Sequence, residues 1–143
     1  MKSRPTTIFL FISGLMLLGI GLGILLVPHG FHASNGIALS NDPNLLSEIR
    51  APGGLLIGSA VLILLGAFRS TGRSLAILLT ILVYGTFGLA RLISMIIDGM
   101  PSEGIVVATA IELAVAALGL LVSYKRAPSQ HAKSSSELAI TPN

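Results

Sequence analysis

Four long apolar runs dominate this sequence of 143 residues and leave it little freedom in how it can fold. They cover residues 7–27, 51–68, 74–97 and 104–124. About 20 mainly apolar residues cross a bilayer as one α-helix, because backbone groups in lipid must bond within the segment. The second run is the shortest, but Asp42 and Pro43 are typical of an N-cap and first helical position, which starts that helix earlier. The sequence therefore predicts four membrane-spanning helices, at about residues 7–27, 43–68, 74–97 and 103–124.

The composition excludes a water-soluble domain. Only 10% of the residues are charged and 52% are hydrophobic, with a mean hydropathy of +0.87. A soluble domain of this size carries roughly 25% charged residues. We therefore expect an all-α membrane protein with one four-helix bundle at residues 7–124, a short cytoplasmic N-terminus at 1–6 and a disordered polar tail at 125–143.

Basic residues mark one side of the predicted bundle. With four spans, both chain ends and the middle loop share a side, which holds seven of the nine Lys and Arg residues: Lys2, Arg4, Arg69, Arg73, Lys125, Arg126 and Lys133. The positive-inside rule makes this side cytoplasmic. The basic residues are therefore topology determinants and not a nucleic-acid surface. The first run could instead be a signal peptide, but its length exceeds the usual 7–15 apolar residues, so we expect a retained helix.

Glycines in the first two runs predict close helix packing. Gly19 and Gly23, and likewise Gly54 and Gly58, are spaced four residues apart. In lipid, rows of small residues at this spacing let helix backbones approach one another. We expect these glycines to pack helices within the chain, and a homodimer interface is the alternative.

An arginine and a glutamate are expected to pair inside the membrane. Arg91 is the only charge in the third run and lies seven residues before Asp98, about 10 Å along a helix. Glu112 lies ten residues after Ser102 on the fourth helix, about 15 Å deep. Because either charge alone would cost about 2.5–3.5 kcal/mol in the membrane, we expect the two to neutralise each other, with Asp98 as a second partner of the arginine.

Other polar residues are expected to join this pair in one outward-opening pocket: Glu48, Arg50, Tyr84, Ser94, Asp98 and Thr109. Ionisable residues within a membrane often mark ligand or proton sites. Our hypothesis is a small binding module for an amphipathic or anionic ligand, such as a lipid headgroup or a quinone. Two alternatives stay open: a proton-coupled transporter of small solutes, or a structural subunit of a membrane complex in which the pair only fixes helix register.

Signs of enzymatic chemistry are weak. The chain has no cysteine, and no catalytic or phosphate-binding motif is present. His29 and His32 have a metal-like interval, but no clear third ligand is close in sequence. We expect no catalysis, no cofactor and no metal.

The segment Glu48 to Gly54, together with Arg91, Asp98-Gly99 and Pro101, carries a family resemblance. Over roughly residues 7–124 the chain resembles the bacterial membrane family known as domain of unknown function 4345. It has a looser similarity to DoxX-like four-helix proteins, some of which resemble subunits of quinone-linked oxidoreductases. The resemblance implies a multi-pass protein of the bacterial inner membrane and assigns no chemistry to any residue.

Overall fold

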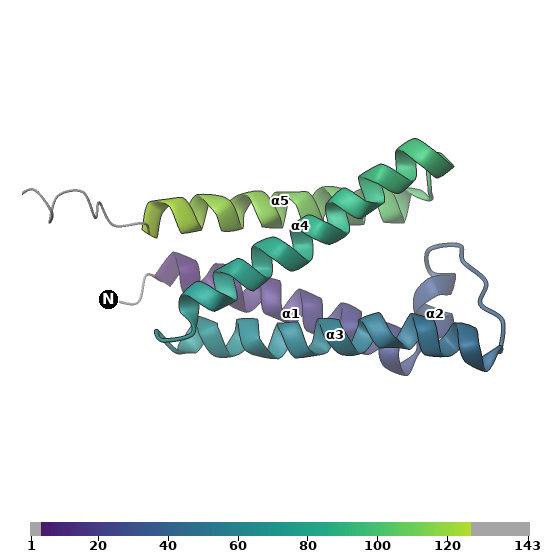
Figure 1. Ribbon diagram of the computed structural model, residues 1–143, viewed down its shortest axis with the longest axis horizontal. Coiled ribbons are helices and arrows are strands. Elements are labelled where there is room, and N and C mark those ends of the chain that lie inside the picture. The colour runs from purple at the N-terminus through teal and green to yellow at the C-terminus, as the bar shows by residue number, and fades with distance from the viewer. Residues whose placement is uncertain (1–3, 127–143) are drawn as a thin grey trace, which may run out of the picture.

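The computed structural model describes residues 4–126, which form five α-helices. Their bounds are α1 Arg4–Leu26, α2 Pro28–Ala33, α3 Pro43–Phe68, α4 Arg73–Asp98 and α5 Glu103–Arg126. All but the short α2 are long and apolar enough to cross a membrane, which confirms the predicted four-helix class (Figure 1). Lys125 and Arg126, expected in the tail, belong to α5. The rest of the expected tail lies outside the described residues.

Local sequence signals explain several helix ends. Asp42 caps α3, because its side chain accepts hydrogen bonds from the backbone N–H of Asn44 at 2.7 Å and of Leu45 at 3.2 Å. Gly99 follows the last residue of α4 with φ at 94°, a left-handed value that favours glycine. The predicted helices leave residues 28–42 as a connection, and this segment begins with the short helix α2. Pro28 supplies the first position of that helix, where its missing N–H costs nothing.

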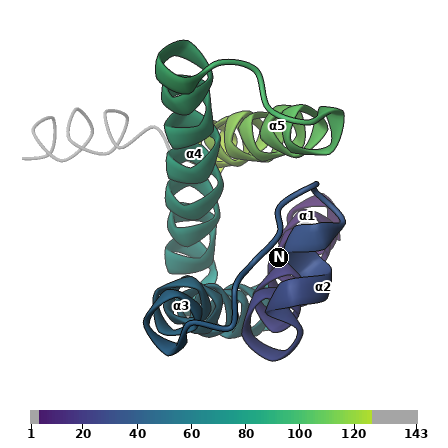
Figure 2. The ribbon, with the colours of Figure 1, turned by 90° about the vertical axis from the view of Figure 1, so that its right-hand side faces the viewer.

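The long helices form two pairs that are joined at one end. α1 packs along α3, and α4 packs along α5. At the α3–α4 turn, Gly66 contacts Ala76, and a Cβ on Gly66 would lie 2.8 Å from the carbonyl oxygen of Gly72. From this turn α4 runs diagonally away from α3, and seen from the opposite end it rises from α3 away from the α1–α3 pair (Figures 1 and 2). The two pairs are therefore in tight contact at the turn and splayed at the other end.

The close approach of α1 and α3 depends on two glycines that the sequence did not single out. A Cβ on Gly21 would lie 2.9 Å from the carbonyl oxygen of Gly53, and a Cβ on Gly53 would lie 3.0 Å from that of Gly21. Three predicted packing glycines are exposed, and a Cβ would meet nothing within 4 Å at any of them: Gly19, Gly54 and Gly58. Their predicted packing within the chain is wrong. Residues two apart on a helix point in directions that differ by about 200°. The four-residue spacing of glycines therefore identifies a helix face with small residues, but not whether that face is turned toward the neighbouring helix.

The fourth predicted glycine, Gly23, does pack within the chain, but against α2. A Cβ at this position would lie 2.6 Å from Cδ2 of Phe31. Gly23 therefore makes room for an aromatic ring of the short helix. The homodimer alternative for the exposed glycines stays a prediction.

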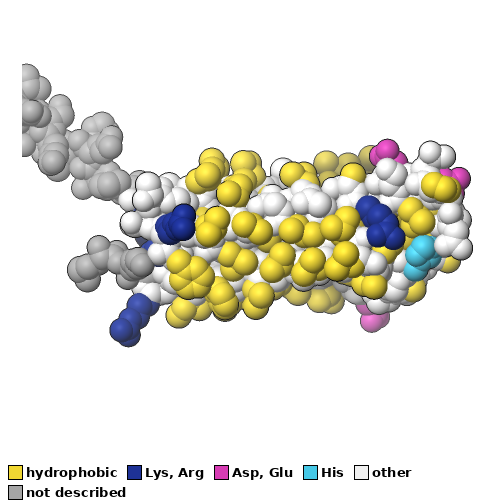
Figure 3. Space-filling model, turned by 90° about the horizontal axis from the view of Figure 1, so that it is seen from below, with side chains coloured by type: hydrophobic (Ala, Val, Ile, Leu, Met, Phe, Trp, Pro, Cys, Tyr) yellow, Lys and Arg dark blue, Asp and Glu magenta, His cyan; other side chains and the backbone are white. Residues whose placement is uncertain are grey.

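Charged side chains lie toward the two ends of the molecule. Figure 3 shows hydrophobic side chains over the middle, acidic and histidine side chains with a basic one at one end, and further basic side chains at the other end. At the joined end, Arg73, one of the predicted topology determinants, is buried and only 2% exposed. Its Nη2 donates hydrogen bonds to the carbonyl oxygen of Ala67 at 2.7 Å and to Oγ1 of Thr7 at 2.9 Å. Arg73 thus links the start of α4 to the end of α3 and the start of α1.

Candidate functional site

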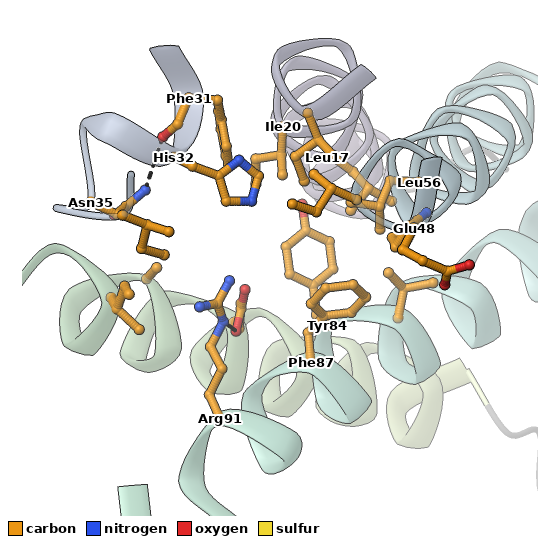
Figure 4. A pocket seen from close by; sticks show the side chains of 18 residues that line it. Leu17, Ile20, Phe31, His32, Asn35, Glu48, Leu56, Tyr84, Phe87 and Arg91 are labelled. Atoms are coloured by element: carbon orange, nitrogen blue, oxygen red, sulfur yellow. Dashed lines mark hydrogen bonds and ion pairs between the residues drawn. The ribbon is translucent and has the colours of Figure 1, made fainter. Parts of the chain in front are cut away.

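A cavity of about 510 Å³ lies at the splayed end, between the two helix pairs. All five helices and the segment after α2 contribute to its walls. Most lining residues are apolar, among them Leu17, Ile20, Ile49, Leu56, Val83 and Phe87. The polar residues that line it are His32, Asn35, Glu48, Arg91 and Glu112 (Figure 4). The cavity is thus an apolar space with a small group of polar side chains.

Arg91 and Glu112, the two residues expected to pair, face each other across the α4–α5 contact. Nε of Arg91 lies 3.2 Å from Oε2 of Glu112. These two atoms are buried, and their alignment falls short of a hydrogen bond, so we describe the contact as an ion pair. The Glu112 side chain is 11% exposed and that of Arg91 is 35% exposed. The carboxylate therefore forms the floor of the site, and the guanidinium reaches further into the cavity.

The guanidinium of Arg91 meets Glu112 through Nε. In Figure 4 the Arg91 side chain points into the cavity. Within residues 4–126, neither Nη atom has a hydrogen-bond partner. Arginine offers five N–H donors in a planar fork, so most of its donor capacity faces the cavity.

Tyr84 and Thr109 were expected in the pocket. Tyr84 does line the cavity and Thr109 does not, and the hydroxyls of both make hydrogen bonds within the helix bundle. Tyr84 lines the cavity with its ring, but its hydroxyl donates to the carbonyl oxygen of Ser13 at 2.6 Å. This bond ties α4 to α1. Thr109 is buried beside the cavity without lining it, and its hydroxyl donates to Ile105 in the preceding turn of α5. Neither hydroxyl is presented to the cavity.

Three other predicted pocket residues lie outside the cavity. Asp98 accepts a hydrogen bond from Ser94 at 2.9 Å, and both are exposed, so the expected contact of Asp98 with Arg91 is wrong. Ser94 is one helical turn before Asp98 and therefore within closer reach of it. Arg50 donates to the carbonyl oxygen of Leu25. It thereby satisfies a carbonyl in the last turn of α1, where a cation is also favoured by the helix dipole.

The segment after α1 supplies lining residues that the sequence did not place in the pocket. His32 and Asn35 line the cavity opposite Arg91, with the ring of Phe31 beside them (Figure 4). The paired histidines had suggested only a weak metal site, and among residues 4–126 no cluster of three His, Asp or Glu side chains could hold a metal ion. Glu48 does line the cavity, but its carboxylate turns outward. In the sequence, the apolar side chain of Phe31 between two histidines was the one sign that this segment folds back onto the bundle.

Comparisons with known proteins assign a family and no activity. A search of curated proteins finds no match, and a search of solved structures finds none. The family model described as Domain of unknown function (DUF4345) matches residues 5–123, which include every residue that lines the cavity. The chain therefore belongs to the DUF4345 family and is a four-helix, multi-pass membrane protein.

Proposed function

We propose that the chain is a membrane-embedded binding module that holds one amphipathic ligand, a lipid or a quinone, in the cavity between its helix pairs. The observation that carries this proposal is the apolar cavity of about 510 Å³ with the free Nη groups of Arg91 at one side. Small-molecule pockets typically measure about 300–1,000 Å³ and combine apolar walls with a few polar groups. The apolar tail would lie along α1, α3 and α4, and the polar head would meet Arg91.

The incomplete pairing of Arg91 favours a ligand over a purely structural ion pair. A pair that only fixes helix register is most stable when its donors are all used, because an unmade hydrogen bond inside a protein is costly. Here Glu112 contacts Nε, and within residues 4–126 the two Nη groups donate no hydrogen bond. An acceptor on a ligand would complete the hydrogen bonding of Arg91.

The basic residues at the joined end suggest on which side the ligand enters. If the positive-inside rule holds, the α3–α4 turn is cytoplasmic and the splayed end opens toward the outer half of the membrane. A ligand would then come from the outer leaflet of the bacterial inner membrane or from the space beyond it. Binding, and not catalysis, is what we propose for this site.

Filling the cavity from α5 tests the proposal. Ala108 lines the cavity, whereas Ala110 on the same helix is exposed and does not. We expect Ala108→Phe to occupy ligand volume and Ala110→Phe, the matched control, to leave the cavity unchanged. Native mass spectrometry of protein released from membranes should show an amphiphile bound to the wild type and to Ala110→Phe, and much less on Ala108→Phe. Equal retention by both variants, at equal helicity, would refute the proposal.

A further inference from the structure

We infer that the head of this ligand is uncharged and carries hydroxyl groups, so that it donates hydrogen bonds as well as accepting them. The inference rests on the proposed function and narrows it to one class of amphiphile. Three properties of the polar lining support it: its charge balance, the tautomer of His32 and the orientation of the Asn35 amide.

The charges around the cavity disfavour an anionic head, which the sequence had left open. Arg91 and Glu112 carry opposite charges 3.2 Å apart and cancel each other at a distance. Glu48 adds a negative charge at the rim. A carboxylate or phosphate head on Arg91 would therefore also approach Glu112, and like charges in a poorly hydrated site repel strongly. A neutral head can approach Arg91 without this repulsion.

His32 presents a hydrogen-bond acceptor to the cavity. Its Nδ1 lies 2.9 Å from the carbonyl oxygen of Pro28. Because a carbonyl oxygen can only accept, Nδ1 carries the proton, and Nε2 of the neutral ring is then an acceptor. In Figure 4 the His32 ring points into the cavity from the side opposite Arg91. The part of the chain that the structure describes gives Nε2 no hydrogen-bond partner.

Asn35 adds a second acceptor beside His32. Its Nδ2 donates to the carbonyl oxygen of Phe31 at 3.3 Å, which leaves Oδ1 to accept. A Cβ on Gly104 would lie 3.2 Å from this Oδ1, so the amide oxygen lies against the start of α5. Ser102, just before α5, also fixes the segment, because its hydroxyl donates to the backbone oxygen of Asn35 at 3.2 Å. The acceptor is therefore held in place by two elements.

The polar lining thus offers donors from one residue and acceptors from several. Arg91 can only donate, whereas His32 Nε2, Asn35 Oδ1 and the Glu112 carboxylate accept. A head with acceptors alone, such as an ester or a quinone carbonyl, would pair with Arg91 and leave the acceptors unpaired. A hydroxyl group can accept a hydrogen bond from Arg91 and donate one to an acceptor of the lining, and a diol has two such groups. A buried acceptor without a donor weakens binding by roughly fivefold or more.

Three amphiphiles with the same apolar chain test the head group. Monolauroylglycerol has two hydroxyls, its dimethyl ether has acceptors only, and laurate is an anion. Their affinities for the wild-type protein in nanodiscs can be measured by native mass spectrometry. We expect monolauroylglycerol to bind roughly fivefold to tenfold more tightly than the ether, and laurate to bind more weakly than monolauroylglycerol. An ether or laurate that binds as tightly as monolauroylglycerol would overturn the inference.

A matched pair of histidine variants tests the acceptor itself. His32→Phe removes Nε2 and keeps a ring beside Phe31, while His29 is exposed on the same helix and does not line the cavity. We expect His32→Phe to lose the preference for monolauroylglycerol over its ether, with the affinity for the ether unchanged, and His29→Phe to keep it. A preference that survives in His32→Phe contradicts the inference. If that variant does not fold, the wild-type comparison of the two ligands decides.

The two proposals fail in different ways. Tight binding of laurate that is lost in Ala108→Phe would overturn only the hydroxyl head and leave the binding module standing. No saturable binding of any of the three amphiphiles to the wild type, or equal binding to Ala108→Phe, would overturn the module and with it the inference.

Discussion

Gly53 and Gly54 are neighbours on α3, and the same substitution should affect them in opposite ways. A Cβ on Gly53 would lie 3.0 Å from the carbonyl oxygen of Gly21, 3.0 Å from Cγ2 of Ile24 and 3.1 Å from the backbone nitrogen of Leu25. Two of these three atoms belong to the α1 backbone and cannot rotate away. A Cβ on Gly54 would meet nothing within 4 Å.

The contact distances set the size of the effect. To bring the Gly53→Ala contacts to an ordinary 3.4 Å, α1 would have to withdraw by about 0.4 Å, and other packing along α1 and α3 would loosen with it. Overpacking of this kind typically costs about 1–3 kcal/mol. Both variants gain the same helix propensity, up to about 1 kcal/mol. This gain cancels in the comparison, so Gly53→Ala should be less stable than Gly54→Ala by about 1–3 kcal/mol.

Equilibrium unfolding by sodium dodecyl sulfate in mixed micelles, followed by circular dichroism, measures this difference. Measurements at two protein concentrations separate the helix contact within the chain from association of two chains. If Gly53→Ala is as stable as Gly54→Ala, the assigned α1–α3 contact is wrong. If Gly54→Ala is destabilised in a concentration-dependent way, the exposed glycines face a second copy, as the alternative from the sequence holds.

Three further predictions follow from the polar contacts and from the basic residues. Glu112→Gln and Arg91→Met should each lower the free energy of unfolding, and a double-mutant cycle should give a coupling energy of about 0.5–3 kcal/mol between them. If the two losses simply add, the two side chains do not interact. Arg73→Met should lower the free energy of unfolding by about 1.5–3 kcal/mol, since it removes charged hydrogen bonds, and a loss below about 0.5 kcal/mol would show that they contribute little. A cysteine at Thr71 in intact cells should resist a membrane-impermeant thiol reagent and one at Ser40 should react, and the reverse pattern would invert the topology.

The sequence predicts the four long helices because hydropathy is a property of a whole segment. Each apolar run is long enough that an error of a few residues at its ends does not change the fold. The Arg91–Glu112 contact was also predictable. The turn between α4 and α5 is only a few residues long, so α4 and α5 lie side by side in opposite directions, and depth from the turn locates each charge.

Details that depend on direction around a helix, or on contacts between distant segments, could not be predicted. Gly54 and Gly53 differ by about 100° around α3, and only the position of α1 decides which of them is buried. Arg73 looks like any basic residue at a membrane surface until α1 and α3 surround it. His32 was singled out only for its metal-like interval with His29, and its place in the cavity depends on α2 folding back over the bundle, for which the apolar Phe31 was the one local sign.

Because the helix pairs are joined at one end only, a small rotation of α4 at that end would displace the residues of the cavity by a larger distance. Arg91 lies 18 residues beyond Arg73 along α4, about 27 Å at 1.5 Å per residue. A rotation of α4 by about 5° around the joined end would therefore shift Arg91 by about 2.4 Å, more than the tolerance of a hydrogen bond. A small change of packing at the turn near Gly66 would therefore produce a larger change in the width of the cavity.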